Sequence, residues 1–214
     1  MPDQMDYATI SEVFRRFEAA EPEPKGELNH TNAYTLVVAV ALSAQATDKG
    51  VNRATEALFK VADTPQKMLE LGEDRLIEHI RTIGLFRNKA RNVIKLSQIL
   101  VDNYGGEVPC SRAALQSLPG VGRKTANVVL NMWWRQPAQA VDTHIFRVAN
   151  RTGLAKGKTV EAVERAIEDH MPAPFQLHAH HWLILHGRYV CTARKPVCKA
   201  CLISDLCEFE EKTL

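Results

Sequence analysis

The chain has 214 residues, 45% of them hydrophobic and 24% charged, which are proportions of a globular protein with one or two small domains. The formal net charge of +2 is too small to indicate a nucleic-acid partner by itself, so any basic binding surface must be local. No apolar run approaches the length of a membrane span, and the acidic residues near the start argue against a targeting peptide. We therefore expect a cytoplasmic protein with no membrane partner.

Apolar residues recur at helical spacing along most of the chain. The valines of residues 36–42 would also suit a strand, but the length of that run and its alanines favour a helix. A first amphipathic helix is expected at residues 6–20. A second is expected at residues 29–48 and is apolar on most sides from Leu36 to Leu42, which predicts burial. Further helices are expected at residues 51–59, 64–71, 73–81, 89–104, 111–117, 159–170 and 175–189. The predicted fold class is all-α.

Residues 118–130, LPGVGRKTANVVL, predict a glycine hairpin between two helices. Gly120 and Gly122 flank one valine, which allows a tight turn whose backbone can approach a ligand closely. The helix that follows presents backbone N–H groups in its first turn, and such a turn binds anions, phosphate above all. The spacing is not that of a nucleotide-binding P-loop, because Arg123 separates the last glycine from the lysine. A plain corner between two helices is the alternative.

Lys124 lies in the first turn of that second helix, where the helix dipole disfavours a positive charge. A lysine so placed is a candidate for an amine nucleophile, although it could instead contact phosphate. Asp142 is expected to begin a later helix as its N-cap. Most such aspartates only cap the helix; the functional alternative is an acid that faces Lys124.

Two places carry side chains suited to interrupting a base stack. Gln45 lies among small polar residues at the end of the expected second helix, and an ordinary helix end is the alternative. Leu85 is expected at a loop tip beside Arg87 and Lys89, and an apolar residue among cations fits a wedge that enters stacked bases. The alternative for Leu85 is packing against the core.

Four of the five cysteines lie in the last 24 residues, which in a reducing compartment indicates a metal site and not disulfides. Four thiolates suit zinc or a [4Fe–4S] cluster, and the single Cys-x₂-Cys pair favours iron–sulfur. Three nearby cations could bind phosphate or balance the charge of a cluster. The cysteines are Cys191, Cys198, Cys201 and Cys207, and the cations are Arg194, Lys195 and Lys199.

The remaining cysteine and a group of histidines are expected to have no chemical role. Cys110 stands alone and is predicted to be a small buried or half-buried residue. His181 and His186 are five residues apart, which is not the i, i+4 spacing of a zinc pair. We expect the histidines at 178, 180, 181 and 186 mainly to pack or to lie on a polar face.

Together these motifs closely resemble the endonuclease III family of the helix–hairpin–helix DNA glycosylase superfamily. The matching stretches are the hairpin, the four-cysteine loop, LSAQATD at 42–48, VDTHIFRV at 141–148 and HWLILHGR at 181–188. They span roughly residues 28–210. The resemblance implies two α-helical domains, residues 26–136 and residues 1–25 with 137–214, and an active site in the cleft between them.

The resemblance also implies a bifunctional DNA glycosylase and AP lyase of base excision repair. Such an enzyme removes oxidised pyrimidines from double-stranded DNA and nicks abasic sites by β-elimination. Lys124 would then be the nucleophile that forms a Schiff base, Asp142 its acidic partner, and the four cysteines the ligands of a [4Fe–4S] cluster. A monomer acting on nucleoid DNA is expected. The expected DNA-contacting residues are Gln45, Leu85, Leu118, Gly120, Val121, Gly122, Arg123, Thr125, His144, Arg147, Arg194, Lys195 and Lys199.

Two departures from the family pattern leave the range of lesions open. Trp133 and Trp134 are bulkier than the small residues expected after the hairpin helix, and Phe86-Arg87 replaces a more polar pair. Three rival functions also remain. A monofunctional glycosylase would lack Lys124, a DNA-binding module would show no chemistry, and a zinc-stapled structural protein would lack iron.

Overall fold

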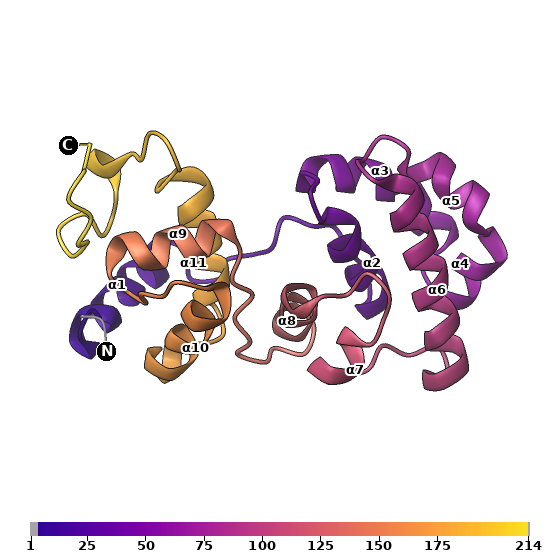
Figure 1. Ribbon diagram of the computed structural model, residues 1–214, viewed down its shortest axis with the longest axis horizontal. Helices are drawn as coiled ribbons and strands as arrows, with labels where there is room; N and C mark the ends of the chain where they lie inside the picture. Colours follow the sequence, from indigo (N-terminus) through magenta and orange to yellow (C-terminus); the bar gives the residue numbers. More distant parts are fainter. Residues whose placement is uncertain (1–3, 214) are drawn as a thin grey trace. The chain divides into compact units, whose positions relative to one another are not determined.

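The computed structural model describes residues 4–213, and all the regular structure in that part of the chain is helical (Figure 1). The all-α prediction is therefore confirmed. The α-helices are α1 Tyr7–Ala20, α2 Ala33–Ser43, α3 Asp48–Val61, α4 Pro65–Leu71, α5 Glu73–Ile80, α6 Phe86–Tyr104, α7 Arg112–Gln116, α8 Arg123–Met132, α9 Thr143–Thr152, α10 Val160–His170 and α11 Ala179–Tyr189, with 3₁₀ turns η1 Ala173–Phe175 and η2 Cys198–Ala200. Between residues 4 and 213, no helix is long and apolar enough to cross a membrane.

The chain divides into two compact units. One runs from Glu27 to Arg135 and is called the hairpin unit below. The other combines the described residues up to Gly26 with those from Gln136 onward, and is called the cysteine-loop unit. Each unit contains its own set of packed helices.

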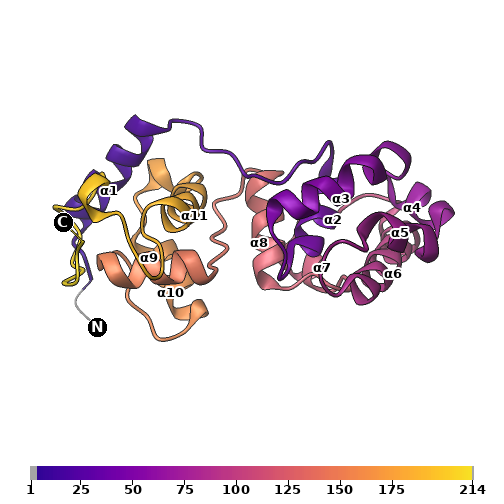
Figure 2. The ribbon, with the colours of Figure 1, turned by 90° about the horizontal axis from the view of Figure 1, so that it is seen from above.

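Helix α2 fills the centre of the hairpin unit because its side chains are apolar on all sides. Its residues Leu36 to Leu42 are at most 9% exposed, and the helix lies against α3, α6 and α8 (Figure 2). Asn32 caps its start by accepting a hydrogen bond from Thr35 N at 2.8 Å. The helix is shorter than the predicted 29–48 because Asn32 caps it late and Ala44 leaves the helical conformation, with ψ 117°, just before Gln45 turns to φ 55°.

Three other helix starts also differ from the predicted ones by three residues or more. Helix α3 begins at Asp48 and not at residue 51, because Thr47 caps it there by accepting a hydrogen bond from Gly50 N. Helix α6 begins at Phe86, three residues earlier than expected, because Leu85 turns into the left-handed region and serves as N-cap. The helix ends at Tyr104, as predicted, and Gly105 follows as its C-cap with φ 61°. Helix α11 begins at Ala179 and not at the predicted residue 175, because the 3₁₀ turn η1 ends at Phe175 and residues 176–178 continue it as a turn.

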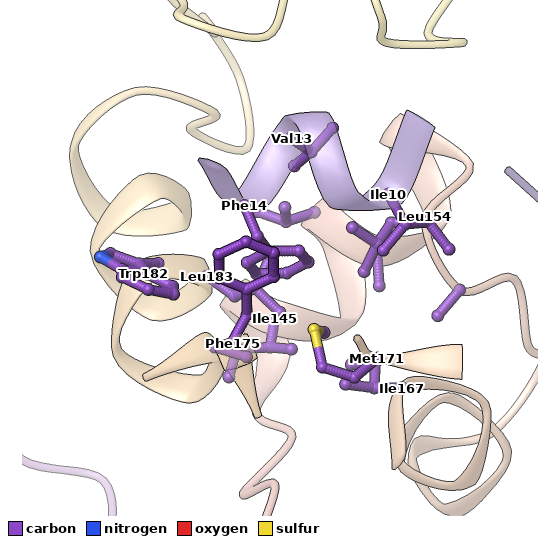
Figure 3. Close-up of a cluster of buried hydrophobic side chains, with 14 of the residues drawn as sticks. Ile10, Val13, Phe14, Ile145, Leu154, Ile167, Met171, Phe175, Trp182 and Leu183 are labelled. Atoms are coloured by element: carbon purple, nitrogen blue, oxygen red, sulfur yellow. The ribbon is translucent and has the colours of Figure 1, made fainter. Parts of the chain in front are cut away.

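Aromatic side chains form the centre of the cysteine-loop unit (Figure 3). The Phe14 ring lies 5.9 Å from Phe175 and 6.0 Å from Trp182, measured between centroids. The indole Nε1 of Trp182 donates to Glu21 O at 2.8 Å, which satisfies its one polar group. This core holds α1 against α9 to α11, although α1 lies more than a hundred residues away in sequence.

The histidines and Cys110, for which no chemical role was expected, differ in burial. His180, His181 and His186 are buried, as expected of packing residues, and burial lowers the pKa of His186 to about 4. The prediction for Cys110 was wrong, because this thiol is exposed. Its segment lies between Gly106 and the start of α7, where the chain runs over the surface.

Candidate functional site

The predicted hairpin joins α7 to α8 through two turn hydrogen bonds, from Leu118 N to Leu115 O and from Val121 N to Leu118 O, each 3.1 Å long. Gly120 has φ 80°, a conformation that strains any residue with a Cβ, and a Cβ there would also lie in tight contact with the Asn92 side chain on α6, at 3.2 Å. Gly122 is the N-cap of α8 and supplies no side-chain cap. The first-turn N–H groups are thus arranged as an anion-binding helix start requires.

Lys124 is the second residue of α8 and is exposed. The first turn holds no acidic residue that would complement the dipole. The helix is anchored instead by buried residues on its other face, among them Ala126, Val129 and Leu130. The charge of Lys124 therefore opposes the dipole of the helix that carries it, whereas the packing of that helix fixes where the amine can reach.

Gln45 and Leu85 share a backbone conformation that is rare for residues with a Cβ. Their φ angles are 55° and 59°, and among residues 4–213 only Arg135 joins them as a non-glycine residue with positive φ. The left-handed conformation costs roughly 1–2 kcal/mol per residue, and such strain gathers at functional sites. Both side chains line one pocket of about 170 Å³, together with Gly120. Leu85 is 61% exposed, so the alternative that it packs on the core is wrong.

Asp142 is the N-cap of α9, as predicted. Its Oδ1 accepts hydrogen bonds from His144 N at 2.9 Å and Ile145 N at 3.0 Å. Arg147, one turn further on, donates from Nε to Cys191 O at 3.0 Å and from Nη2 to Gly187 O at 2.7 Å. Asp142 is therefore held rigidly, on a helix that is tied directly to the first cysteine of the loop.

All four C-terminal cysteines line a single pocket. Burial raises the pKa of the Cys201 and Cys207 thiols, and the other thiolates of the group raise both further. Arg151 Nη1 donates to Cys191 Sγ at 3.8 Å and Phe209 N to Cys207 Sγ at 3.5 Å. Donors aimed at sulfur suit thiolate ligands of a metal.

The cysteine loop, residues 191–213, has little apolar burial of its own. Only Pro196 and Ile203 in it are buried. In the described part of the chain, no three metal-ligating side chains are arranged as a finished metal centre. The loop thus brings together the right donor set for a metal or cluster, and its sparse core is what a metal-stapled segment has.

Two arginines for which the sequence predicted no role hold this loop. Arg16 on α1 donates to Asp205 Oδ1 at 2.6 Å and to Leu202 O at 2.9 Å. Arg151 on α9 donates to Thr192 O and Ala193 O, each at 2.8 Å. No local spacing signals such interactions, because the partners of Arg16 lie 186 and 189 residues away.

The comparisons with known proteins agree with this geometry. Residues 38–173 match the model of the HhH-GPD superfamily of base excision DNA repair proteins. Endonuclease III of Treponema pallidum (strain Nichols) is 57% identical over 203 residues, 95% of this chain and 96% of the relative. The chain belongs to the endonuclease III family. Endonuclease III of Escherichia coli (strain K12) is 55% identical over 208 residues, 97% of this chain and 99% of the relative.

The fold of endonuclease III is shared along nearly the whole chain. A solved structure of a trapped endonuclease III–DNA covalent intermediate, in an estranged-adenine complex, superposes with a TM-score of 0.88 at 41% identity, covering 95% of this chain and 96% of that one. The protein is a DNA glycosylase and AP lyase of base excision repair. The matched region includes the hairpin, Lys124 and Asp142, whereas the cysteine loop lies beyond the family model.

Proposed function

We propose that Lys124 is the nucleophile of a bifunctional reaction on oxidised pyrimidines. The damaged nucleotide leaves the base stack because its C1′ atom cannot be reached inside the duplex. The neutral amine of Lys124 attacks C1′, the base departs, and a Schiff base joins the lysine to the opened sugar. Loss of a C2′ proton then expels the 3′ phosphate and nicks the strand. The observation that carries this role is an exposed amine at the start of α8, directly after a phosphate-binding hairpin.

Asp142 is proposed to stabilise the positive charge that develops on the sugar and to help move the proton from Lys124. A carboxylate fixed by two backbone N–H groups needs no reorganisation to do this. Gln45 and Leu85 are proposed to fill the space that the flipped nucleotide leaves. Their exposed, strained positions on one pocket of the hairpin unit support this role.

A [4Fe–4S] cluster is proposed at Cys191, Cys198, Cys201 and Cys207. It would staple the loop and supply no step of the reaction. The exposed Arg194, Lys195 and Lys199 on that loop would bind phosphates of the duplex, while the hairpin residues bind others through their backbone. The proposed partner is double-stranded DNA with damaged pyrimidines or abasic sites, met by a monomer on the nucleoid.

Borohydride trapping tests the covalent role of Lys124. An imine adduct is reduced to a stable amine, so wild-type protein and an abasic or oxidised-pyrimidine duplex should give a stable protein–DNA species. Lys124→Gln should abolish that species and retain DNA binding. The control is Lys60→Gln, which removes a lysine that is exposed on α3. Trapping that persists in Lys124→Gln would move the nucleophile elsewhere. If the wild type releases the base but gives no trapped species, the protein is a monofunctional glycosylase.

Absorption and metal analysis test the cluster. Iron bound to cysteine gives broad absorption near about 400 nm and a yellow-brown colour. Stoichiometric zinc in a colourless protein would support the structural-zinc alternative.

A further inference from the structure

The pocket beneath Gln45 and Leu85 contains a lysine that the proposed chemistry does not use. Lys89 was expected to be a cation at the loop tip. It is instead 7% exposed and lines the pocket of about 170 Å³ between the end of α2 and the first turns of α6. Among the described residues its Nζ has no hydrogen-bond partner. A buried amine without a partner is unfavourable, because an ammonium needs either water or an acceptor.

The surroundings of this amine are electropositive. Lys89 is the fourth residue of α6, so it lies close to the positive end of the helix dipole. Helix α6 has no acidic residue in its first turn, and Leu85 as N-cap makes no side-chain cap hydrogen bond. Asn88 and Asn92 add carboxamide donors to the lining. Burial lowers the pKa of Lys89, as expected where no anion is present.

A purely structural role does not explain this arrangement. A lysine can stabilise the carbonyl end of a neighbouring helix, and α2 ends at the same pocket, but Lys89 Nζ donates to no carbonyl there. Methionine would fill the same volume without an unpaired donor. A buried amine that destabilises the folded protein and lines a pocket indicates a ligand that accepts its hydrogen bonds.

We propose that this pocket binds a phosphoryl group, with the Lys89 ammonium as its counterion and the amides of Asn88 and Asn92 as further donors. The pocket adjoins Gly120 of the hairpin and both strained residues. The source of this phosphoryl group rests on the proposed function. If that function holds, the phosphoryl group is a backbone phosphate of the DNA strand beside Leu85. A free phosphate offers the same chemistry.

Thermal melting with inorganic phosphate tests the site without any DNA chemistry. Phosphate should raise the Tm of the wild type, because a ligand of the folded state stabilises it. Lys89→Met should melt at a higher temperature than wild type in phosphate-free buffer and should lose most of the phosphate-induced shift. Lys89→Arg should keep the shift. Lys95→Met, which removes an exposed lysine of the same helix, should leave it unchanged.

DNA binding shows whether the phosphoryl group in this pocket comes from the DNA backbone or from free phosphate. Lys89→Met should lower the slope of log K against log salt by about one unit for a duplex with an abasic-site analogue. Borohydride trapping at saturating protein should persist in this variant, so failure here and failure of the Lys124 mechanism are distinguishable. A reduced phosphate shift with an unchanged salt slope would support the site and assign it to free phosphate. A lower Tm in Lys89→Met with an unchanged phosphate shift would overturn the proposal.

Discussion

The two units hold their functional residues by different means. In the hairpin unit, apolar burial fixes them: α2 is enclosed from Leu36 to Leu42, and Lys124 extends from a helix whose other face is buried. In the cysteine-loop unit, residues 191–213 bury only two side chains and are held by arginines that bind backbone carbonyls. Catalytic and DNA-contacting residues of the hairpin unit should therefore be replaceable without unfolding it. In the cysteine-loop unit, many of the functional residues also stabilise the fold.

Loss of a cluster ligand should have the largest effect on stability and DNA binding, and this effect should be confined to the cysteine-loop unit. In Cys201→Ala we expect the loop 191–213 to lose protection from hydrogen exchange and DNA affinity to fall sharply. A structural zinc site contributes about 10–16 kcal/mol of apparent binding energy in peptides, which is comparable to the stability of a whole domain. Exchange in residues 27–135 should remain as in wild type.

Cys110→Ala is the matched control, because Cys110 is exposed and belongs to the other unit. If the loop stays protected in Cys201→Ala, the ties from Arg16 and Arg151 suffice to fold it, and the contrast between the units disappears.

Replacing Asp142 should reduce activity and, depending on the substitute, stability. Asn at this position still caps α9, so Asp142→Asn should keep the fold and slow base release by about 10²-fold or more. Asp142→Ala should slow it similarly and also lose about 0.5–2 kcal/mol of stability with the cap. Single-turnover base release and urea unfolding measure the two effects.

Lys124→Gln is the comparison from the hairpin unit, and it should lose less stability than Asp142→Ala, because it removes a cation that opposes the dipole of α8 and not a helix cap. Equal destabilisation by Lys124→Gln and Asp142→Ala would contradict the division between the units.

Local patterns in the sequence were sufficient for much of this structure. Helical spacing predicted the buried stretch of α2, and the N-cap preference of aspartate predicted Asp142. The backbone conformations of Gln45 and Leu85 were not predictable, because left-handed φ at non-glycine residues is imposed by tertiary packing against local preference. For the same reason the start of α6, which follows Leu85, was given the wrong position.

Long-range polar interactions could not be predicted from the sequence either. Arg16 donates hydrogen bonds to a loop at the other end of the chain. The spacing of charged residues in a sequence does not indicate which distant residue they will contact. The burial of Lys89 was not predicted because cations near a loop are usually exposed, and only the position of α2 against α6 determines otherwise.

Leu85 allows a test in which stability and activity move in opposite directions. Leu85→Gly and Leu85→Ala both remove the wedge and should slow excision from duplex DNA by about tenfold or more, since a buried leucine contributes about 1.5–3 kcal/mol. Leu85→Gly should in addition be more stable than Leu85→Ala by about 1 kcal/mol, because glycine adopts φ 59° without strain. Excision and melting measured together check both effects; wild-type excision by either variant would remove Leu85 from this role.

The smallest effect concerns the exposed cations of the cysteine loop. Each of Arg194→Ala, Lys195→Ala and Lys199→Ala should lower the salt slope of duplex binding by about 0.9, the value expected when the protein neutralises one phosphate fewer on B-DNA. Lys156→Ala is the control, because Lys156 Nζ is paired with Glu208 Oε2 at 2.7 Å and its removal should leave the slope unchanged. If the cations only balance a cluster, the slope will stay constant while the loop variants lose iron faster. The loop would then be a structural element, and phosphate binding would fall to the hairpin unit, whose backbone donors remain when any side chain is removed.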